Sequence, residues 1–326
     1  MLILEILKKY SDENNKLSQK EIATLVERDY SVPVDRHTLK RNLDSLFDFN
    51  CGVERATRDK NTGKTGGWYY ERDFTDAEVR MLIDGLLFSK YIPYSECKDL
   101  VKKLEGLAGV SFKHSHGLPE NRPENKEIFL NIEVLLQAMS AGKKVTFHLR
   151  RYGVDKKSYV KLDEHGVPRR YVTSPYEIVI TNGRYYLIGV PDSGNHLFHY
   201  RLDNICNIIM LKNYKRRSLR EIPGYGNGLK LAKYIKEHPY MVYSGDIVPT
   251  CFRVTKDMIG QVFDWFGKDI RLVDDTEDTV IVTVTVNEEA MLYWALQYGL
   301  HIEVLKPQSL RKKLQTTIKE MAKRYK

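Results

Sequence analysis

The residues best suited to chemistry are polar side chains gathered in one short segment of the chain. They are Arg36, His37, Thr38, Lys40, Arg41 and Asn42. Apolar side chains recur beside them at helical spacing, at Leu39, Leu43, Leu46 and Phe47. The segment is therefore predicted to be a helix with its apolar side inward and its polar side outward. Guanidinium, amide and hydroxyl groups pair with base edges and phosphates in a major groove, so this helix is a candidate for reading nucleic acid.

The neighbouring segments predict the elements that position this helix. Residues 1–10 carry an apolar stripe at helical spacing, and the capping box Ser18-Gln19-Lys20-Glu21 starts a second helix. Pro33 blocks any continuation of that helix, and Asp35 is the expected N-cap of the third. Two short extended runs, residues 53–58 and 68–70, are joined by a glycine-rich turn. Three helices and a hairpin in this order form a winged helix-turn-helix pattern.

Further DNA contacts are expected at both ends of this pattern. Ser18 and Gln19 begin the second helix, and the hairpin offers cations to the flanking backbone: Arg55, Arg58, Lys60 and Lys64. The competing interpretation is a protein-docking module, because residues 1–75 have a net charge of 0. Residues 36–64, however, hold seven basic and four acidic side chains, which favours nucleic acid.

The excess positive charge of the chain, +9 overall, lies in one stretch. Residues 141–220 hold 16 basic and 6 acidic side chains. Such a local field attracts anions, phosphates foremost. The alternative is a solvated basic face that serves solubility alone.

The rest of the chain alternates between helical and extended patterns. Residues 74–108 and 126–140 read as helices, which serve either dimerisation or ordinary packing. Period-two strands follow at 145–149, 176–180, 184–188, 197–202 and 205–211, and turns between them predict a small bent sheet or barrel. Residues 221–250 form a connector whose Gly224–Gly228 stretch reads as a flexible hinge. Residues 251–326 alternate strand and helix, as in a small α+β domain.

The order of these parts resembles the bacterial WYL-domain transcriptional regulators. The name-giving triplet stands here as Tyr185-Tyr186-Leu187, with tyrosine in place of the first tryptophan. Ser174-Pro-Tyr176 before it and Tyr200-Arg-Leu-Asp203 after it also resemble the family. The tail from Tyr293 to Pro307 is similar to the family's C-terminal extension. The resemblance implies a homodimeric transcription factor whose barrel senses a ligand, in some members a nucleic acid, and relays it to the DNA-binding domain.

Strand alternation then suggests which barrel residues would meet that ligand. The simplest assignment buries one set of side chains: Tyr185, Leu187, Phe198, Tyr200 and Leu202. Tyr186, His199 and Arg201 are left to line a pocket, and the resemblance places Ser174 nearby. Four more cations extend the patch: Arg150, Arg151, Arg169 and Arg170. Such groups suit a phosphate or a base-bearing ligand.

Each of the three pocket residues also has a purely structural interpretation. Arg201 has a possible ion-pair partner in Asp203 or Glu177. His199 has the alternative of a satisfied surface histidine, and plain packing is the favoured interpretation for Tyr186.

The expected fold class is multidomain α+β. It comprises a winged helix-turn-helix domain (1–73), a helical linker and dimerisation region (74–140), a small Sm/SH3-like WYL β-barrel (141–220), the connector (221–250) and a C-terminal α+β extension domain (251–326).

The expected function is transcription regulation by a homodimer that binds double-stranded operator DNA and an anionic effector, a nucleotide or single-stranded nucleic acid. One alternative is a single-strand-binding module without regulation. An enzyme acting on a phosphorylated substrate is the least favoured, because no nucleophile–base motif or P-loop is present and His114-Ser-His116 lacks a second metal-binding cluster. We expect no cofactor and no metal.

Composition also suggests a compartment. Four cysteines lie far apart without a C-x-x-C spacing, which fits a reduced cytoplasmic protein. The N-terminal segment has no basic leader before its apolar stretch, and no uncharged apolar run approaches the ~20 residues of a membrane span. No membrane partner is expected.

Overall fold

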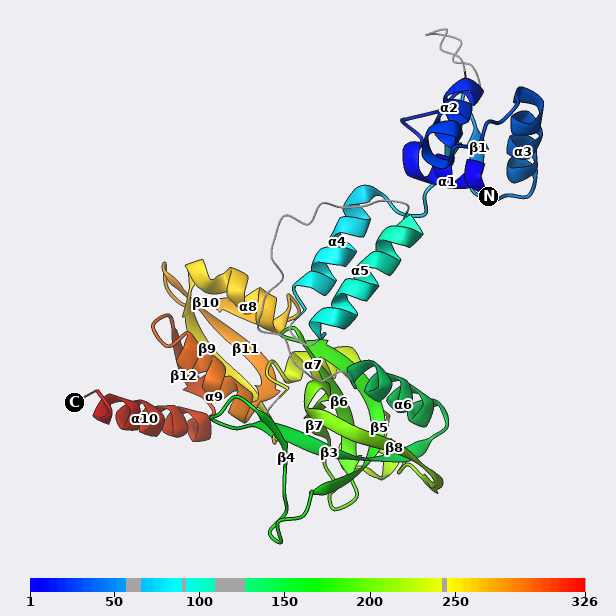
Figure 1. The fold of residues 1–326 in the computed structure, drawn as a ribbon. Helices are drawn as coiled ribbons and strands as arrows, with labels where there is room; N and C mark the ends of the chain where they lie inside the picture. The colour runs from blue at the N-terminus through cyan, green and yellow to red at the C-terminus, as the bar shows by residue number, and fades with distance from the viewer. Residues whose placement is uncertain (57–65, 90–91, 109–126, 242–244, 326) are drawn as a thin grey trace. The chain divides into compact units, whose positions relative to one another are not determined.

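The structure is a computed structural model that describes residues 1–56, 66–89, 92–108, 127–241 and 245–325 (Figure 1). The chain divides into two compact units, residues 1–122 and 123–326. No helix among the described residues is long and apolar enough to cross a membrane.

The first unit begins with three helices and a two-stranded antiparallel sheet. They are α1 (Leu2–Tyr10), α2 (Gln19–Tyr30), α3 (Arg36–Asp48), β1 (Val53–Arg55) and β2 (Trp68–Tyr70). The predicted caps are confirmed: Ser18 and Glu21 form a reciprocal capping box, and Asp35 accepts hydrogen bonds from the first amides of α3. The core holds Ile6, Leu7, Ile22, Val26, Leu39, Leu43, Val53 and Trp68. One expectation is wrong: Phe47 is 43% exposed and lies edge-on to Trp68, with ring centroids 6.4 Å apart.

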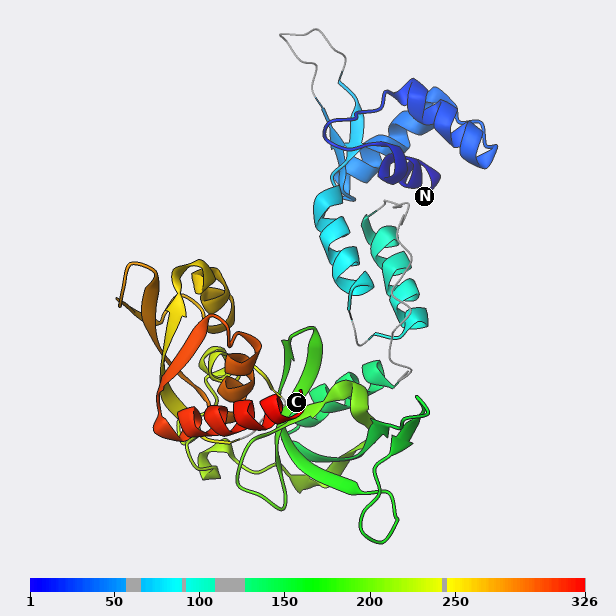
Figure 2. The same ribbon diagram turned by 90° about the vertical axis from the view of Figure 1, so that its left-hand side faces the viewer.

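Two helices, α4 (Asp76–Leu87) and α5 (Tyr94–Ala108), complete the described part of this unit. They lie side by side in both views (Figures 1 and 2) and bury a seam that includes Ile83, Cys97 and Val101. Thr75 and Glu78 cap α4 with a second capping box.

The second unit starts with α6 (Ile128–Ser140) and a six-stranded antiparallel sheet. The strands are β3 (Lys143–Tyr152), β4 (Ser158–Val160), β5 (Arg170–Thr181), β6 (Arg184–Pro191), β7 (Phe198–Arg201) and β8 (Ile205–Lys215). Their order is β4-β3-β5-β6-β7, with β8 paired to β3. All five predicted strands are present, and β4 is an additional one. The helix predicted as the end of the linker packs on this sheet instead, because Asn131 is buried and donates to the Ile205 carbonyl at 2.8 Å.

The connector differs from the expected hinge. It contains a short helix, α7 (Leu231–Glu237), whose Tyr234 is buried in the same cluster as Tyr186 and Ile188 of the sheet. Ile222 and Met241 are buried there too. The connector is therefore part of the folded core around the sheet, held by apolar contacts that its glycine-rich sequence did not reveal.

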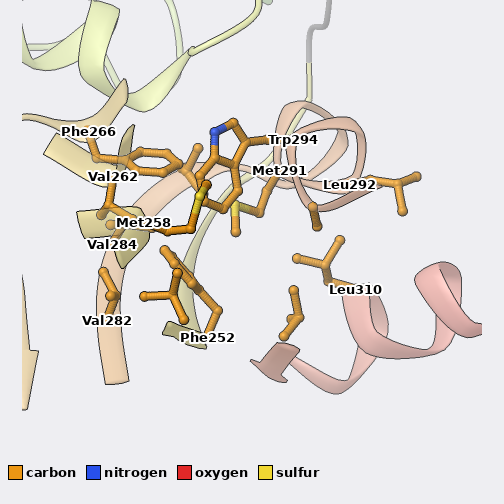
Figure 3. Packing of buried hydrophobic residues seen from close by; sticks show 14 of the residues in the cluster. Phe252, Met258, Val262, Phe266, Val282, Val284, Met291, Leu292, Trp294 and Leu310 are labelled. Atoms are coloured by element: carbon orange, nitrogen blue, oxygen red, sulfur yellow. The ribbon is translucent and has the colours of Figure 1, made fainter. Parts of the chain in front are cut away.

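The C-terminal part is a four-stranded sheet in the order β10-β11-β9-β12, with helices packed on it. Its elements are β9 (Ile247–Thr255), α8 (Ile259–Phe266), β10 (Arg271–Asp274), β11 (Thr279–Asn287), α9 (Glu288–Gln297), β12 (Ile302–Lys306) and α10 (Gln308–Lys323). Figure 3 shows the core, in which Trp294 packs between Phe252 and Phe266. The α+β pattern is confirmed, with β10 as the strand that the sequence did not indicate.

Candidate functional site

The polar side chains of α3 that were predicted to contact DNA lie on the surface, but they do not all face the same direction. Arg36, Lys40 and Arg41 are exposed, whereas Thr38 is half-buried. Hydrogen bonds from Thr38 lower the pKa of Asp35, so Thr38 takes part in the helix cap. His37 and Arg41 are also exposed and lie one turn apart, directed away from the core residues Leu39 and Leu43.

A groove brings several of the predicted DNA contacts together. It has a volume of about 1210 Å³, and its lining includes Ser18, Gln19, Arg36 and Arg55. Arg55 stacks over Trp68 at 5.5 Å, which fixes the guanidinium at one wall. The Ser18 hydroxyl, by contrast, accepts the Glu21 amide hydrogen bond and so serves the start of α2. Arg58, Lys60 and Lys64 lie outside the described residues.

Thr38 and Asn42 lie on the opposite flank of α3. They line a separate groove of about 410 Å³ together with apolar residues of the first helix and of the turn before α3, such as Leu2 and Pro33. The predicted set therefore splits into a cationic flank and a polar, less charged flank.

The cations of this unit differ in their ion pairing. Lys9 and Arg28 contact Asp29 at 2.9 and 2.7 Å, and Arg80 contacts Asp84 at 2.9 Å. The exposed lysines of α5 form no ion pair among the described residues. Within the described residues, Arg36, Lys40 and Arg41 form no ion pair. These charges remain available to an anionic partner.

The second predicted site falls on one face of the six-stranded sheet. Antiparallel register pairs Tyr186 with Arg201, Ile188 with His199, and Val190 with Ser174, so these side chains share a face. The prediction that Leu187, Tyr200 and Leu202 lie on the buried opposite face is confirmed. Tyr185 is only half-buried and Phe198 is 40% exposed, so those two burial predictions are wrong.

The face expected to be open is largely covered, which corrects the predicted pocket. Tyr186 is 4% exposed and Ser174 is fully buried. The Ser174 hydroxyl accepts the Arg217 backbone amide hydrogen bond at 3.1 Å. The cause is the connector, whose buried Tyr234 covers this side of the sheet. Alternation shows which residues share a face, but it does not show whether a later segment covers that face.

His199 is held by this covering segment. Its Nε2 lies 2.6 Å from the Tyr234 hydroxyl, and its ring packs against His238 with centroids 5.3 Å apart. Burial, assisted by the neighbouring His238, lowers the pKa of His199 to about 3. Burial also lowers the pKa of His238 and raises that of Tyr234. His199 is therefore a neutral packing residue rather than a cationic ligand contact.

Arg201 forms the ion pair with Asp203 that the sequence suggested, yet part of the local positive charge is not neutralised. Its Nε and Nη2 contact Asp203 at 3.1 and 2.5 Å. Arg184 contacts the same carboxylate at 3.3 Å. Two guanidinium groups thus share one buried acid, which leaves one net positive charge, and both arginines remain about one-third exposed. We call Arg184 and Arg201, together with the Asp203 carboxylate that both contact, the arginine pair.

The other four predicted arginines are dispersed around β3 and β5. Arg150 lies 3.6 Å from Glu127, and Arg170 donates to the Thr146 hydroxyl at 2.8 Å. Arg169 stacks over Tyr171 at 5.2 Å. Arg151 is exposed on β3, and no bond to it is found among the described residues.

Three further residues were missed from the sequence: Arg184, Tyr234 and His238. Arg184 adjoins the aromatic triplet, and its spacing of two from Tyr186 was a usable signal. Tyr234 and His238 lie four apart on a helix that only hydrophobic periodicity in the connector could have indicated. They border a cavity of about 880 Å³ with both Lys230 and Glu237 in its lining. No group of His, Cys, Asp or Glu within the described residues is arranged to hold a metal ion.

Comparison with known families agrees with this architecture. A family model for the WYL domain matches residues 131–210, which span most of α6 and the sheet as far as β8. The chain contains a WYL domain. A second model, the WCX domain, matches residues 250–322, the four-stranded sheet and its helices. The WYL match begins inside α6, in accord with the packing of that helix on the sheet.

Solved structures give weaker likenesses. Proteasome accessory factor B/C (PafBC) of Arthrobacter aurescens is 15% identical, with a TM-score of 0.28, over 96% of this chain and 46% of that chain. A CRISPR Cas-related protein is 15% identical, with a TM-score of 0.36, over 99% of this chain and 83% of that chain. This chain thus spans less than half of the length of PafBC. Such low scores carry no functional argument, and comparison with the curated proteins found no match.

Proposed function

We propose that this WYL-domain protein is a non-enzymatic transcription regulator that binds duplex DNA through α3 and responds to an anionic effector. The observation that supports DNA binding best is the set of unpaired cations at the start of α3. Arg36, Lys40 and Arg41 are exposed without a carboxylate partner among the described residues, whereas Lys9, Arg28 and Arg80 of the same unit are paired.

The placement of these cations suits a helix that enters a major groove. They lie in the first two turns of α3, and the acids Asp44 and Asp48 lie in its C-terminal half. In helix-turn-helix proteins the N-terminal residues of the recognition helix contact base edges. The adjoining groove at Arg36 and Arg55 suits a phosphate backbone. On this basis we propose that residues 1–70 form a winged helix-turn-helix.

The arginine pair is the proposed effector contact. Its net positive charge and partial exposure favour a phosphate-bearing ligand, a nucleotide or a single strand. Tyr186, Ser174 and His199 then act behind it as packing and positioning residues. Arg150 and the dispersed arginines of β3 and β5 add to the field around it.

A homodimer is the proposed functional state. Exposed apolar side chains on α4 and α5, among them Met81 (75% exposed) and Leu107 (77%), favour a second copy as the partner. A Met81→Glu, Leu107→Glu variant is expected to halve the mass measured by light scattering. An unchanged dimer mass would place the interface elsewhere.

The proposed DNA binding is tested by selecting fragments from a random duplex pool with the purified protein, with and without an added oligonucleotide. Enrichment of a two-fold-related sequence that Arg36→Ala, Arg41→Ala abolishes, and that the oligonucleotide changes, is the expected result. Equal recovery of all sequences by both proteins contradicts operator binding. Nucleotide turnover in the same preparation contradicts the non-enzymatic assignment.

A further inference from the structure

Helix α10 carries a local concentration of positive charge. Residues 308–325 hold six cationic side chains and one acidic one, Glu320. Lys312, Lys319 and Lys323 are seven and four positions apart, so they project from one side of the helix. We call these three residues the lysine stripe.

Ion pairing distinguishes the lysine stripe from Arg311 and Lys313 of the same helix. Arg311 contacts Glu303 at 2.9 Å, and Lys313 contacts Glu288 and Glu289 at 2.5 and 3.0 Å. The three stripe lysines are exposed, and no ion pair to them is found among the described residues. The helix therefore uses some cations for its own docking and leaves one aligned set free.

The opposite side of α10 is apolar. Leu310 and Leu314 are buried in the core of the four-stranded sheet, and Ile318 and Met321 continue the same stripe, 54% and 41% exposed. Figure 1 shows the C-terminal end of α10 extending beyond the sheet. The lysine stripe lies on the exposed side of the helix, where Lys312 and Lys319 also border a groove of about 530 Å³ beside β12.

We propose that the lysine stripe of α10 binds the phosphate backbone of nucleic acid, as a contact separate from α3. A rise of 1.5 Å per residue spaces its lysines about 10 and 6 Å apart. One strand of B-form DNA presents a charge about every 3.4 Å along the axis, so the stripe matches a stretch of about five nucleotides. Three lysines without base-reading groups between them would bind without sequence preference.

A nucleic acid fits this arrangement better than a membrane surface does. A helix that lies in a bilayer interface inserts its apolar stripe, and its cations then lie beside the headgroups. Here the start of the apolar stripe is buried against the protein's own sheet through Leu310 and Leu314. The stripe lysines are exposed, so a polyanion can approach them without displacing that packing.

The test uses the full chain and a mixed-sequence duplex of about three helical turns. Lys312→Gln, Lys319→Gln, Lys323→Gln is compared with wild type across a salt series, and removal of each lysine–phosphate interaction is expected to lower the slope of log K against log salt by about 0.9. The expected decrease is therefore about 2 to 3 in slope, with at least tenfold weaker binding at low salt. Glutamine favours helices nearly as well as lysine, and circular dichroism verifies that α10 remains folded.

Two controls make the outcome specific. Lys98→Gln, Lys102→Gln, Lys103→Gln removes the same charge from exposed positions of α5 and is expected to keep the wild-type slope. Replacement of all three stripe lysines by arginine keeps the charge and is expected to retain binding. The proposal is overturned if the triple glutamine variant keeps the wild-type slope of log K against log salt for duplex binding. It is also overturned if this variant loses binding to anionic vesicles but still binds the duplex as wild type does. The Arg36→Ala, Arg41→Ala protein tests α3 separately, so failure of one site is distinguishable from failure of the other.

Discussion

The Tyr234 hydroxyl lies 2.6 Å from Nε2 of His199, and this hydrogen bond joins the connector to the six-stranded sheet. Tyr234 also stacks on His238, with ring centroids 4.0 Å apart. The three rings seal the face of the sheet that carries Tyr186. The connector is therefore held against the WYL sheet by polar as well as apolar contacts.

Tyr234→Phe is expected to weaken this seal without creating a cavity. The substitution leaves the buried Nε2 of His199 without its partner, which costs about 1–3 kcal/mol of unfolding free energy. The change is measured as a lower urea midpoint at an unchanged m-value. Tyr214→Phe, at an exposed tyrosine of β8, serves as the control and is expected to have a smaller effect. Equal midpoints for Tyr234→Phe and wild type would show that the bond does not contribute.

Stability is expected to fall as the pH drops from about 6.5 toward 3. His199 has a folded-state pKa of about 3 against an ordinary value of 6.5, so at low pH the unfolded chain binds a proton that the folded chain does not. The stabilisation that depends on the neutral His199 is fully present above pH 6.5. Below pH 6.5 the free energy of unfolding falls by up to about 1.4 kcal/mol per pH unit. His238 acts in the same direction.

The pH dependence is measured by urea unfolding between pH 7 and pH 4, with exposed His165→Gln as the control. His199→Gln is expected to flatten the profile relative to wild type, because the titrating group is removed. A wild-type profile and a His199→Gln profile of the same slope would contradict the burial of a neutral histidine at this position.

Arg201→Ala is expected to weaken binding of a single-stranded DNA of about 12 nucleotides by about tenfold. The effect arises because the arginine pair would then be one guanidinium on one carboxylate, with no net positive charge. Arg220→Ala, an exposed arginine just after the sheet, is the charge-matched control. Fluorescence anisotropy measures both. Equal affinities for Arg201→Ala and Arg220→Ala would remove the effector contact from this face.

The sequence predicted the elements well wherever local signals were strong. The capping box at Ser18, the N-cap at Asp35 and the period-two runs of the WYL sheet each correspond to an observed element. The division into strands and helices of residues 251–326 was likewise predicted, because its apolar positions alternate clearly. β4 and β10 were missed because each has only three or four residues, too few for a pattern of alternation to be recognised.

The site was harder to predict because it depends on packing between distant segments. The burial of Tyr186 and His199 follows from Tyr234, more than thirty positions later in the sequence, and no local pattern encodes that contact. The charge pattern of α10 was hidden for another reason. A window over residues 221–326 averages six cations of the last helix with the acids that precede it. A count per helix would have shown the excess.

DNA binding by α3 is tested most directly by the salt dependence of duplex affinity in the Arg36→Ala, Arg41→Ala protein. On the selected operator, the variant is expected to bind at least tenfold more weakly at low salt and to show a slope of log K against log salt that is lower by about 2, one phosphate-equivalent contact for each arginine. Lys98→Ala, Lys102→Ala, which removes two exposed charges from α5, is expected to match wild type. If the α3 variant instead retained the wild-type affinity and slope, α3 would not be the DNA-reading helix, and the assignment of residues 1–70 would be contradicted.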